Sequence, residues 1–295
     1  MNTIKNIGLL LSILLSSNIF AQDDLLKDID TEANQEVTSA FKSLKIINFE
    51  STKLVAKKEL FLVIAHRFDY INNGFDNFFG LDNANTQIRF AYGLSDKITI
   101  QASRSGLEKT YDLSAKYLII NQKSNGFPFT ILGFNSIAVN SEMKKDRYPN
   151  LKFSNRLAYT TQLLISRKFS DKLSMQLIPT FFHENTIIDQ YDNNNKIILP
   201  NPQDNSQFMM GIGGRYKITN RLSINADYGL HLNRSKTSVY RNPLSLGIDL
   251  DTGGHIFQMH FTNAKAMHET GFMGKTNGDW GKGEIAFGFN LIRVF

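Results

Sequence analysis

The feature that most constrains this chain is a two-residue alternation of apolar and polar side chains. Residues 221–233 show it most clearly, because every second position there is apolar or aromatic and the positions between are polar or glycine. The apolar members are Leu222, Ile224, Ala226, Tyr228, Leu230 and Leu232. Successive side chains of a β-strand point to opposite faces, so this period predicts a strand with one apolar and one polar face.

The same period recurs along the chain and predicts about twelve strands. The expected strands are residues 59–69, 86–94, 97–104, 109–121, 127–140, 153–169, 172–184, 207–218, 221–233, 244–250, 254–263 and 283–295. Short connections mostly alternate with long ones, as in outer-membrane barrels with short periplasmic turns and longer outer loops. We therefore expect an all-β fold, namely an antiparallel transmembrane up-and-down β-barrel over residues 59–295. Ile224 should then face lipid and Asn225 the lumen.

Two expected strands, residues 59–69 and 127–140, carry apolar side chains on both faces. Such strands also occur in the middle of soluble sheets, where both faces are covered. Alternatively, they are barrel strands whose inner face packs against something in the lumen. A soluble sandwich or a periplasmic barrel stays open as an alternative fold, because a period of two does not distinguish a protein interior from lipid.

Residues 1–21 have the layout of a secretory signal peptide. One charge, Lys5, precedes an apolar run at residues 7–15, and Ala21 precedes an acidic stretch. The run is shorter than the roughly 20 residues that a membrane-spanning helix needs. We expect cleavage after Ala21 and export to the cell outer membrane; an uncleaved anchor is the alternative.

Residues 22–58 differ from the rest of the chain. They begin with an acidic stretch that has helix-compatible apolar spacing, and residues 41–50 then look strand-like. A strand there would make the total an odd thirteen, whereas an even number of strands puts both ends of the barrel on one side. We interpret the segment as a periplasmic extension or a lumen plug; a soluble tail without contacts is equally consistent with its composition.

Charged residues of both signs fall on the expected polar face. The lumen-facing candidates are Arg67, Arg89, Lys116, Arg156, Arg215, Asp227, Asp249 and Glu284. A slight positive excess in a lumen predicts a pore that favours small anions or acidic solutes. The alternative is a salt-bridged interior that conducts little.

The long connection after the first strand is unusually aromatic for a solvated loop. Phe75, Phe78 and Phe79 lie there beside Asp76 and Asp82. One hypothesis is that this loop folds into the barrel mouth as a constriction or binds a ligand. The other is that its aromatic side chains pack on one another, as they do in many compact loops.

The sequence offers little support for catalysis. The absence of cysteine excludes disulfide scaffolds, Cys-ligated zinc and iron–sulfur clusters. His255 and His260 are five residues apart on one strand, so they point to opposite faces and cannot share a metal. The net charge of +6 is mild and scattered, which gives no support for a nucleic-acid partner. We expect no catalytic residues, no metal and no cofactor, although a barrel hydrolase stays a minor alternative.

Several short stretches carry a resemblance to a known family. They are His66-Arg67-Phe68, residues 78–82, Asn135, residues 138–140, 213–216, 242–247, 252–255, 278–281 and 293–295. From about residue 37 onward the chain resembles an uncharacterised Bacteroidetes-type family of predicted outer-membrane β-barrel proteins, a domain of unknown function. The resemblance implies an outer-membrane barrel in a Gram-negative bacterium and no catalytic residues.

These observations lead to two main functional hypotheses. The first is an outer-membrane channel or passive transporter for small solutes. The second is a non-conducting structural or partner-binding barrel of an outer-membrane or electron-transfer assembly. In both, the expected partners are outer-membrane lipid and the barrel-assembly machinery. Phe295 is the terminal aromatic residue that such machinery commonly meets on a last strand.

Overall fold

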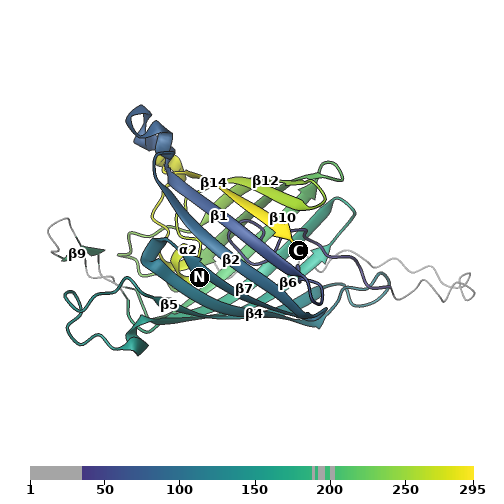
Figure 1. The fold of residues 1–295 in the computed structure, drawn as a ribbon, viewed down its shortest axis with the longest axis horizontal. Coiled ribbons are helices and arrows are strands. Elements are labelled where there is room, and N and C mark those ends of the chain that lie inside the picture. Colours follow the sequence, from purple (N-terminus) through teal and green to yellow (C-terminus); the bar gives the residue numbers. More distant parts are fainter. Residues whose placement is uncertain (1–34, 188–189, 192–196, 200–202) are drawn as a thin grey trace, which may run out of the picture.

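The architecture is a closed antiparallel barrel of twelve strands (Figure 1). The computed structural model describes residues 35–187, 190–191, 197–199 and 203–295. The barrel strands are β1 (Leu60–Tyr70), β2 (Ala84–Ser95), β3 (Ile98–Ser105), β4 (Thr110–Ile120), β5 (Thr130–Asn140), β6 (Leu157–Lys168), β7 (Leu173–Glu184), β10 (Ser206–Lys217), β11 (Leu222–His231), β12 (Leu244–Asp251), β13 (His255–Thr262) and β14 (Ala286–Val294). Each strand pairs with its neighbour in the chain, and β1 pairs with β14 to close the sheet.

The expected strands correspond one to one with these twelve, so the up-and-down barrel is confirmed. The largest difference is at the start of β6, where Phe153–Arg156 form a 3₁₀ helix, η4, before the strand begins. A separate two-stranded hairpin, β8 (Gln190–Tyr191) with β9 (Ile197–Leu199), lies between β7 and β10. Residues 41–50 form no barrel strand, which resolves the odd count.

The short turns gather at the end of the barrel where β1 begins and β14 finishes. Hydroxyl groups help to close two of them: Ser170 Oγ accepts the backbone N–H of Leu173 at 3.1 Å, and Thr219 Oγ1 accepts that of Leu222 at 3.0 Å. Such local side-chain bonds favour tight turns over continued strand. The long connections therefore all lie at the other end, which we call the long-loop end.

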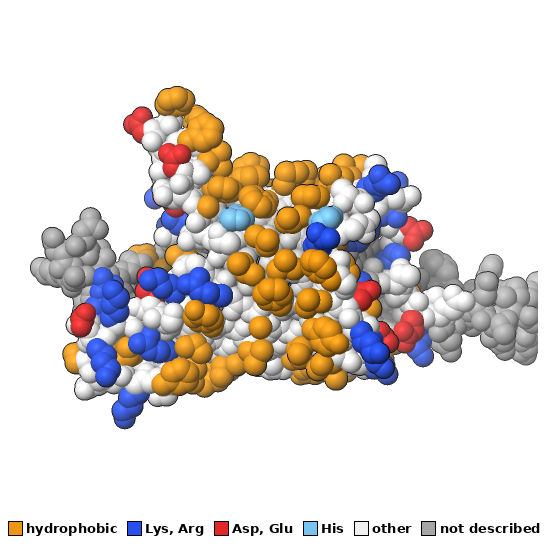
Figure 2. All heavy atoms as spheres, in the orientation of Figure 1, with side chains coloured by type: hydrophobic (Ala, Val, Ile, Leu, Met, Phe, Trp, Pro, Cys, Tyr) orange, Lys and Arg blue, Asp and Glu red, His pale blue; other side chains and the backbone are white. Residues whose placement is uncertain are grey.

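The barrel is apolar outside, and much of its inner face is polar. On β11, Ile224 is 46% exposed on the outer face, whereas Asn225 is 2% exposed and faces the lumen. Figure 2 shows hydrophobic side chains spread over the outer wall, with charged groups mainly toward the two ends. An outer wall of this kind suits contact with hydrocarbon. The backbone N–H and C=O groups of the strands can lie in hydrocarbon because the closed barrel pairs them with neighbouring strands.

Among the residues that the structure describes, we find no helix with the length and apolar character needed to cross a membrane.

The first prediction tests how deeply the outer face is embedded. Ile212 lies midway along β10, whereas Ile224 is the third residue of β11 and lies near a turn. Ile212→Arg should lower the free energy of unfolding by about 2–4 kcal/mol, because a charge at the bilayer midplane is costly. Ile224→Arg should lower the free energy of unfolding by only about 0–1 kcal/mol, because water and headgroups at the membrane interface solvate the new guanidinium group. Urea titration in phospholipid vesicles measures both, and a larger loss at Ile224 would contradict this placement.

Candidate functional site

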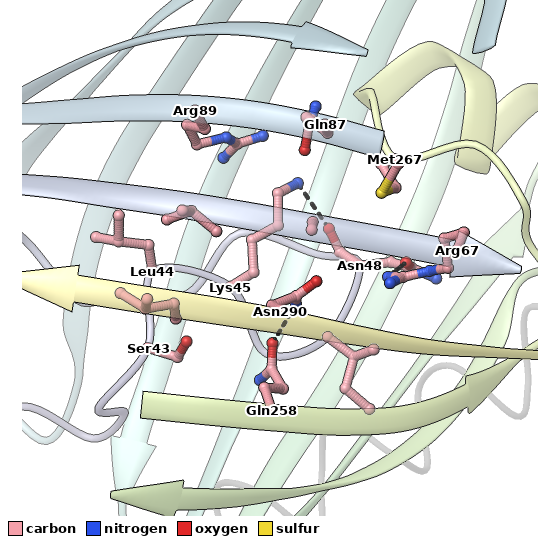
Figure 3. Close-up of a pocket in the computed structure, with 14 residues that line it drawn as sticks. Ser43, Leu44, Lys45, Asn48, Arg67, Gln87, Arg89, Gln258, Met267 and Asn290 are labelled. Atoms are coloured by element: carbon pink, nitrogen blue, oxygen red, sulfur yellow. Dashed lines mark hydrogen bonds between the residues drawn. The ribbon is translucent and has the colours of Figure 1, made fainter. Parts of the chain in front are cut away.

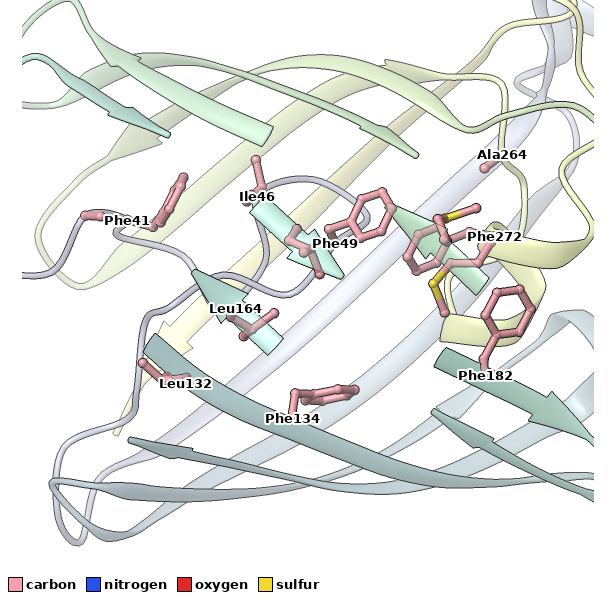
Figure 4. Close-up of a cluster of buried hydrophobic side chains, with 13 residues drawn as sticks. Phe41, Ile46, Phe49, Leu132, Phe134, Leu164, Phe182, Ala264 and Phe272 are labelled. Carbon is pink, nitrogen blue, oxygen red and sulfur yellow. The ribbon is translucent and has the colours of Figure 1, made fainter. Parts of the chain in front are cut away.

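The lumen is filled by the chain itself. Residues 41–55, which we call the plug, fold into the barrel interior from the end with the short turns and return to that end without joining the sheet (Figure 4). Leu44, Ile46, Phe49 and Val55 are all buried there. The expectation of a segment that enters the lumen therefore describes residues 41–55; residues 1–34, with the expected signal peptide, lie outside the described part of the chain.

Backbone groups of the plug are paired by side chains of the barrel wall. Asp227 Oδ2 accepts the N–H groups of Ile47, Asn48 and Phe49 at 3.0, 2.7 and 3.1 Å. Three successive N–H groups that converge on one oxygen form a backbone nest for an anion. On another part of the wall, Lys116 Nζ donates to the carbonyl oxygens of Leu44 at 2.7 Å and of residue 51 at 3.0 Å.

The plug also brings one carboxylate into a ring of buried cations. Glu50 is fully buried, and its oxygens lie 2.5 Å from Arg89 Nη1, 2.8 Å from Lys116 Nζ and 3.1 Å from Lys45 Nζ. Burial by itself would raise the pKa of Glu50, but the charges of Lys116, Lys45 and Arg89 hold it well below its usual range. Lys45 pairs in addition with Glu269 at 2.5 Å, which links the plug to a loop from the opposite end.

That loop, residues 263–285, closes the long-loop end from within. Its short helix α2 (Glu269–Gly274) is buried along its whole length. Lys275 Nζ bridges two carboxylates, Glu184 at the end of β7 at 2.6 Å and Glu108 in the connection between β3 and β4 at 3.1 Å. Burial would raise the pKa of Glu108, but Lys275 and His268 hold it below its usual range. Charge pairing therefore fixes the loop to the wall in the same way as it fixes the plug.

Plug and loop meet in one apolar cluster (Figure 4). The rings of Phe49 and Phe272 pack edge to face, with centroids 4.9 Å apart. The other buried members are Ala40, Phe41, Ile46, Leu132, Phe134, Leu164, Ile178, Phe182, Met209, Ala264 and Met273. Leu132 and Phe134 come from β5, so the apolar inner face of this strand packs on material in the lumen, as one of the two sequence interpretations proposed.

Little free space is left between plug and wall. A cavity of about 20 Å³ is lined by residues of the plug and of strands β1, β2, β13 and β14 (Figure 3). Its lining includes Lys45, Asn48, Arg67, Arg89 and Asn290. A space of this size holds about one water molecule. Among the described residues, this cavity is therefore too small to admit a solute.

The sequence-predicted lumen residues divide into two groups. Arg67, Arg89, Lys116, Asp227 and Asp249 are buried in the lumen. The others lie nearer the ends of the barrel: Arg156 donates to the carbonyl oxygen of Asn140 at 3.1 Å, Arg215 donates to Ser223 Oγ at 3.0 Å, and Glu284 accepts the backbone N–H of Asp279 at 2.9 Å.

The buried charges among these candidates lie on different strands according to their sign, although Asp112, which is also buried, shares β4 with Lys116. The cations Arg67, Arg89 and Lys116 lie on β1, β2 and β4, whereas Asp227 and Asp249 lie on β11 and β12. The plug complements both sides, because its Glu50 meets Arg89 and Lys116 while its backbone N–H groups meet Asp227. Sequence reasoning missed Glu50, Lys45 and the α2 loop; the apolar inner faces of residues 59–69 and 127–140 were the signal that something fills the lumen.

The structure corrects the expected constriction by Phe75, Phe78 and Phe79. These side chains are 80%, 56% and 51% exposed, on a loop that stands out from the side of the barrel (Figures 1 and 2). The mouth is occupied instead by residues 263–285. The alternative of mutual packing holds in part, because the rings of Phe75 and Phe79 lie 6.3 Å apart.

Known proteins support the barrel architecture. Residues 41–295 match a family model described as "Membrane bound beta barrel domain (DUF5777)". The structure of KdgM porin in complex with disordered oligogalacturonate is similar at a TM-score of 0.50 and 9% identity, covering 80% of this chain and 99% of that chain. NanC porin gives 0.47 and 8%, covering 80% and 98%; Acinetobacter baumannii outer membrane protein Omp33 gives 0.43 and 7%, covering 81% and 99%. No curated protein matches the sequence.

The second prediction concerns the buried charge cluster. Glu50→Gln should lower the free energy of unfolding by about 3–5 kcal/mol at neutral pH, because it removes the anion that pairs with the buried cations Arg89 and Lys116, whereas Lys45 keeps Glu269. Since the pKa of Glu50 is lowered in the folded protein, its contribution is complete above its unfolded pKa of about 4.3. That contribution is lost as the pH falls through the lowered folded value.

Urea unfolding from pH 7 downward measures this loss. The variant should lack the part of the acid dependence that the wild type owes to Glu50. The exposed Glu142→Gln provides the matched control and should leave both stability and pH dependence nearly unchanged. Equal behaviour of the two variants would refute a stabilising role for the buried cluster.

Proposed function

The chain belongs to this family of membrane-bound β-barrel domains, and from that premise we propose that it is an outer-membrane channel for small acidic solutes, closed in the described conformation by its own plug. The observation that carries the proposal is that closure comes from a segment outside the sheet. All twelve strands pair around the barrel without residues 41–55. Movement of the plug would therefore leave the hydrogen-bonded wall intact.

The wall behind the plug is suited to water and solute. Polar side chains that face the lumen include Gln87, Gln101, Gln162, Gln176, Ser174, Ser223, Asn225 and Gln258. A barrel of this size lies between small barrels filled by side chains and wide porins. Displacement of the plug would thus expose a passage with one polar side and one apolar side, the latter formed by the wall residues of the apolar cluster on β5, β6, β7 and β10.

The charge pattern supports an acidic solute. Arg89 and Lys116 bind a carboxylate in the closed barrel, and this carboxylate belongs to Glu50 of the plug. A solute carboxylate that reaches the same two cations would compete with Glu50 for them. Fixed cations of this kind favour anions in a pore, and salt weakens the preference.

Export and membrane insertion belong to the same proposal. The signal peptide would be cleaved after Ala21, and the barrel-assembly machinery would insert the chain into the outer membrane. We assign no reaction, metal or cofactor to the lumen. In the part of the chain that the structure describes, no group of three metal-ligating side chains comes together.

The second candidate is a barrel that does not conduct and serves an assembly. It is favoured by the extent of the internal packing, since plug, α2 loop and wall share one apolar cluster and two sets of buried ion pairs. Opening would disrupt all of these contacts. Conductance separates the two candidates.

The third prediction is that deletion of residues 35–55, which also removes the contacts of Phe49 and Lys45 with the α2 loop and so releases that loop, opens the pore. In a planar bilayer the full chain should conduct little, whereas the deletion variant should show a steady conductance that favours anions, because Arg89 and Lys116 lose Glu50. Arg89→Met with Lys116→Met in the deletion background should keep the conductance and lose the anion preference. A heat-dependent shift in gel mobility verifies that each barrel is folded.

A disulfide provides a second test in the full-length chain. Asn48 of the plug donates to Ser245 Oγ of β12 at 2.9 Å, and the chain has no cysteine of its own. Oxidised N48C/S245C should lose any openings of the wild type, and a reductant should restore them. A folded deletion variant that does not conduct would remove the channel proposal and leave the second candidate.

A further inference from the structure

The loop between β1 and β2 presents aromatic side chains to the outside of the barrel. It contains two 3₁₀ segments, η1 (Ile71–Asn73) and η2 (Phe75–Gly80), and we call residues 71–83 the aromatic finger. Phe75, Phe78 and Phe79 are more than half exposed on it. Large exposed apolar groups that gather on one element usually mark an interaction surface.

The finger is held in a fixed shape. Phe78 and Phe79 have φ values of 43° and 54°, in the left-handed region that side chains other than glycine seldom adopt. The Phe79 N–H donates to the Gly74 carbonyl oxygen at 2.8 Å, and a Cβ on Gly80 would lie 2.4 Å from the Asp69 carbonyl oxygen. At the base, the Ile71 N–H donates to the Ile285 carbonyl oxygen at 2.9 Å. Backbone strain held by such a frame is characteristic of functional segments.

The direction of the finger relates it to the outer wall. Figures 1 and 2 show it rising from the side of the barrel at the long-loop end, away from the mouth. The wall beside its base is aromatic. The ring of Phe68 on β1 stacks on that of Phe287 on β14, with centroids 5.8 Å apart, and the ring centroid of Phe261 on β13 lies 5.6 Å from that of Phe287. In Figure 2, hydrophobic atoms cover the tip of the finger and the flank above this wall.

We propose that the aromatic finger is a membrane anchor, whose phenyl rings lie in the interfacial layer of the leaflet around the long-loop end. The apolar flank of the finger continues the outer surface that a membrane-bound barrel already presents to lipid. Aromatic side chains are enriched at membrane interfaces, and apolar area buried there scales with binding strength.

This geometry favours lipid over a protein partner. A finger that extends sideways from a barrel in a bilayer has the membrane surface beneath its apolar flank. Asp76 and Asp82 are both exposed. Carboxylates are excluded from hydrocarbon, so they suit a finger that lies at the membrane surface. The inference is independent of the plug, and it holds whether or not the lumen conducts.

Tryptophan fluorescence tests the proposal in the full-length protein. The chain has one tryptophan, Trp280, so Trp280→Phe gives a dark background. Phe79→Trp is then introduced, with Phe75→Trp as a second reporter. Ile212→Trp, midway along β10 on the outer wall, is the lipid reference, and Val239→Trp on the loop of residues 232–243 is the reference for another long loop. All variants are reconstituted in phosphatidylcholine vesicles and checked for folding by heat-dependent gel mobility.

The readouts are emission wavelength, quenching by lipids brominated at different depths, and quenching by aqueous iodide. Both finger reporters should emit at shorter wavelength than Val239→Trp, and bromine near the headgroup should quench them more than bromine near the chain end. Iodide should quench them less than it quenches Val239→Trp. Water-like emission with full iodide access at both reporters would overturn the anchor, as would protection that develops only after a soluble protein is added.

Discussion

The structure depends on the burial of one carboxylate, Glu50, among three cations. Arg89 and Lys116 belong to the wall, and Lys45 belongs to the plug itself. Taking several charges out of water is costly unless they compensate one another. Movement of the plug would therefore take Glu50 away from Arg89 and Lys116. It would also let water reach these two cations, which the plug now covers. This mutual dependence makes the closed lumen a defined state.

Apolar packing between the plug and the α2 loop adds to the ion pairs in closing the lumen. The plug enters from the end with the short turns, and α2 folds inward from the long-loop end. They meet where Phe49 packs against Phe272. Lys45 of the plug also forms an ion pair with Glu269 of α2 at this junction. Contacts between two segments that are far apart in the chain thus close the passage from both sides, so movement of either one is coupled to the other.

The outside of the barrel has a different requirement from the charged lumen, because it faces the bilayer. The wall must be apolar where it meets hydrocarbon, and its backbone must be fully paired, which the closure of β1 on β14 achieves. Inside, polar and charged side chains are kept because the plug supplies partners for them. The same chain therefore has an exterior suited to lipid and an interior whose polar groups are partly paired by its own plug.

The sequence by itself determined the twelve strands, their alternating faces and the position of the short turns, because a period of two reports which face each side chain takes. It also placed Arg67, Arg89, Lys116, Asp227 and Asp249 on the inner face. Only the tertiary structure decided what that face meets. Residues 41–50 look strand-like in the sequence, but this local pattern does not indicate which residues they meet. Nothing local indicates that Glu50 lies between Arg89 and Lys116, 39 and 66 positions further along. The direction of the Phe75–Phe79 loop was likewise undecided, because it depends on backbone strain and on anchoring to Ile285, which local composition does not encode.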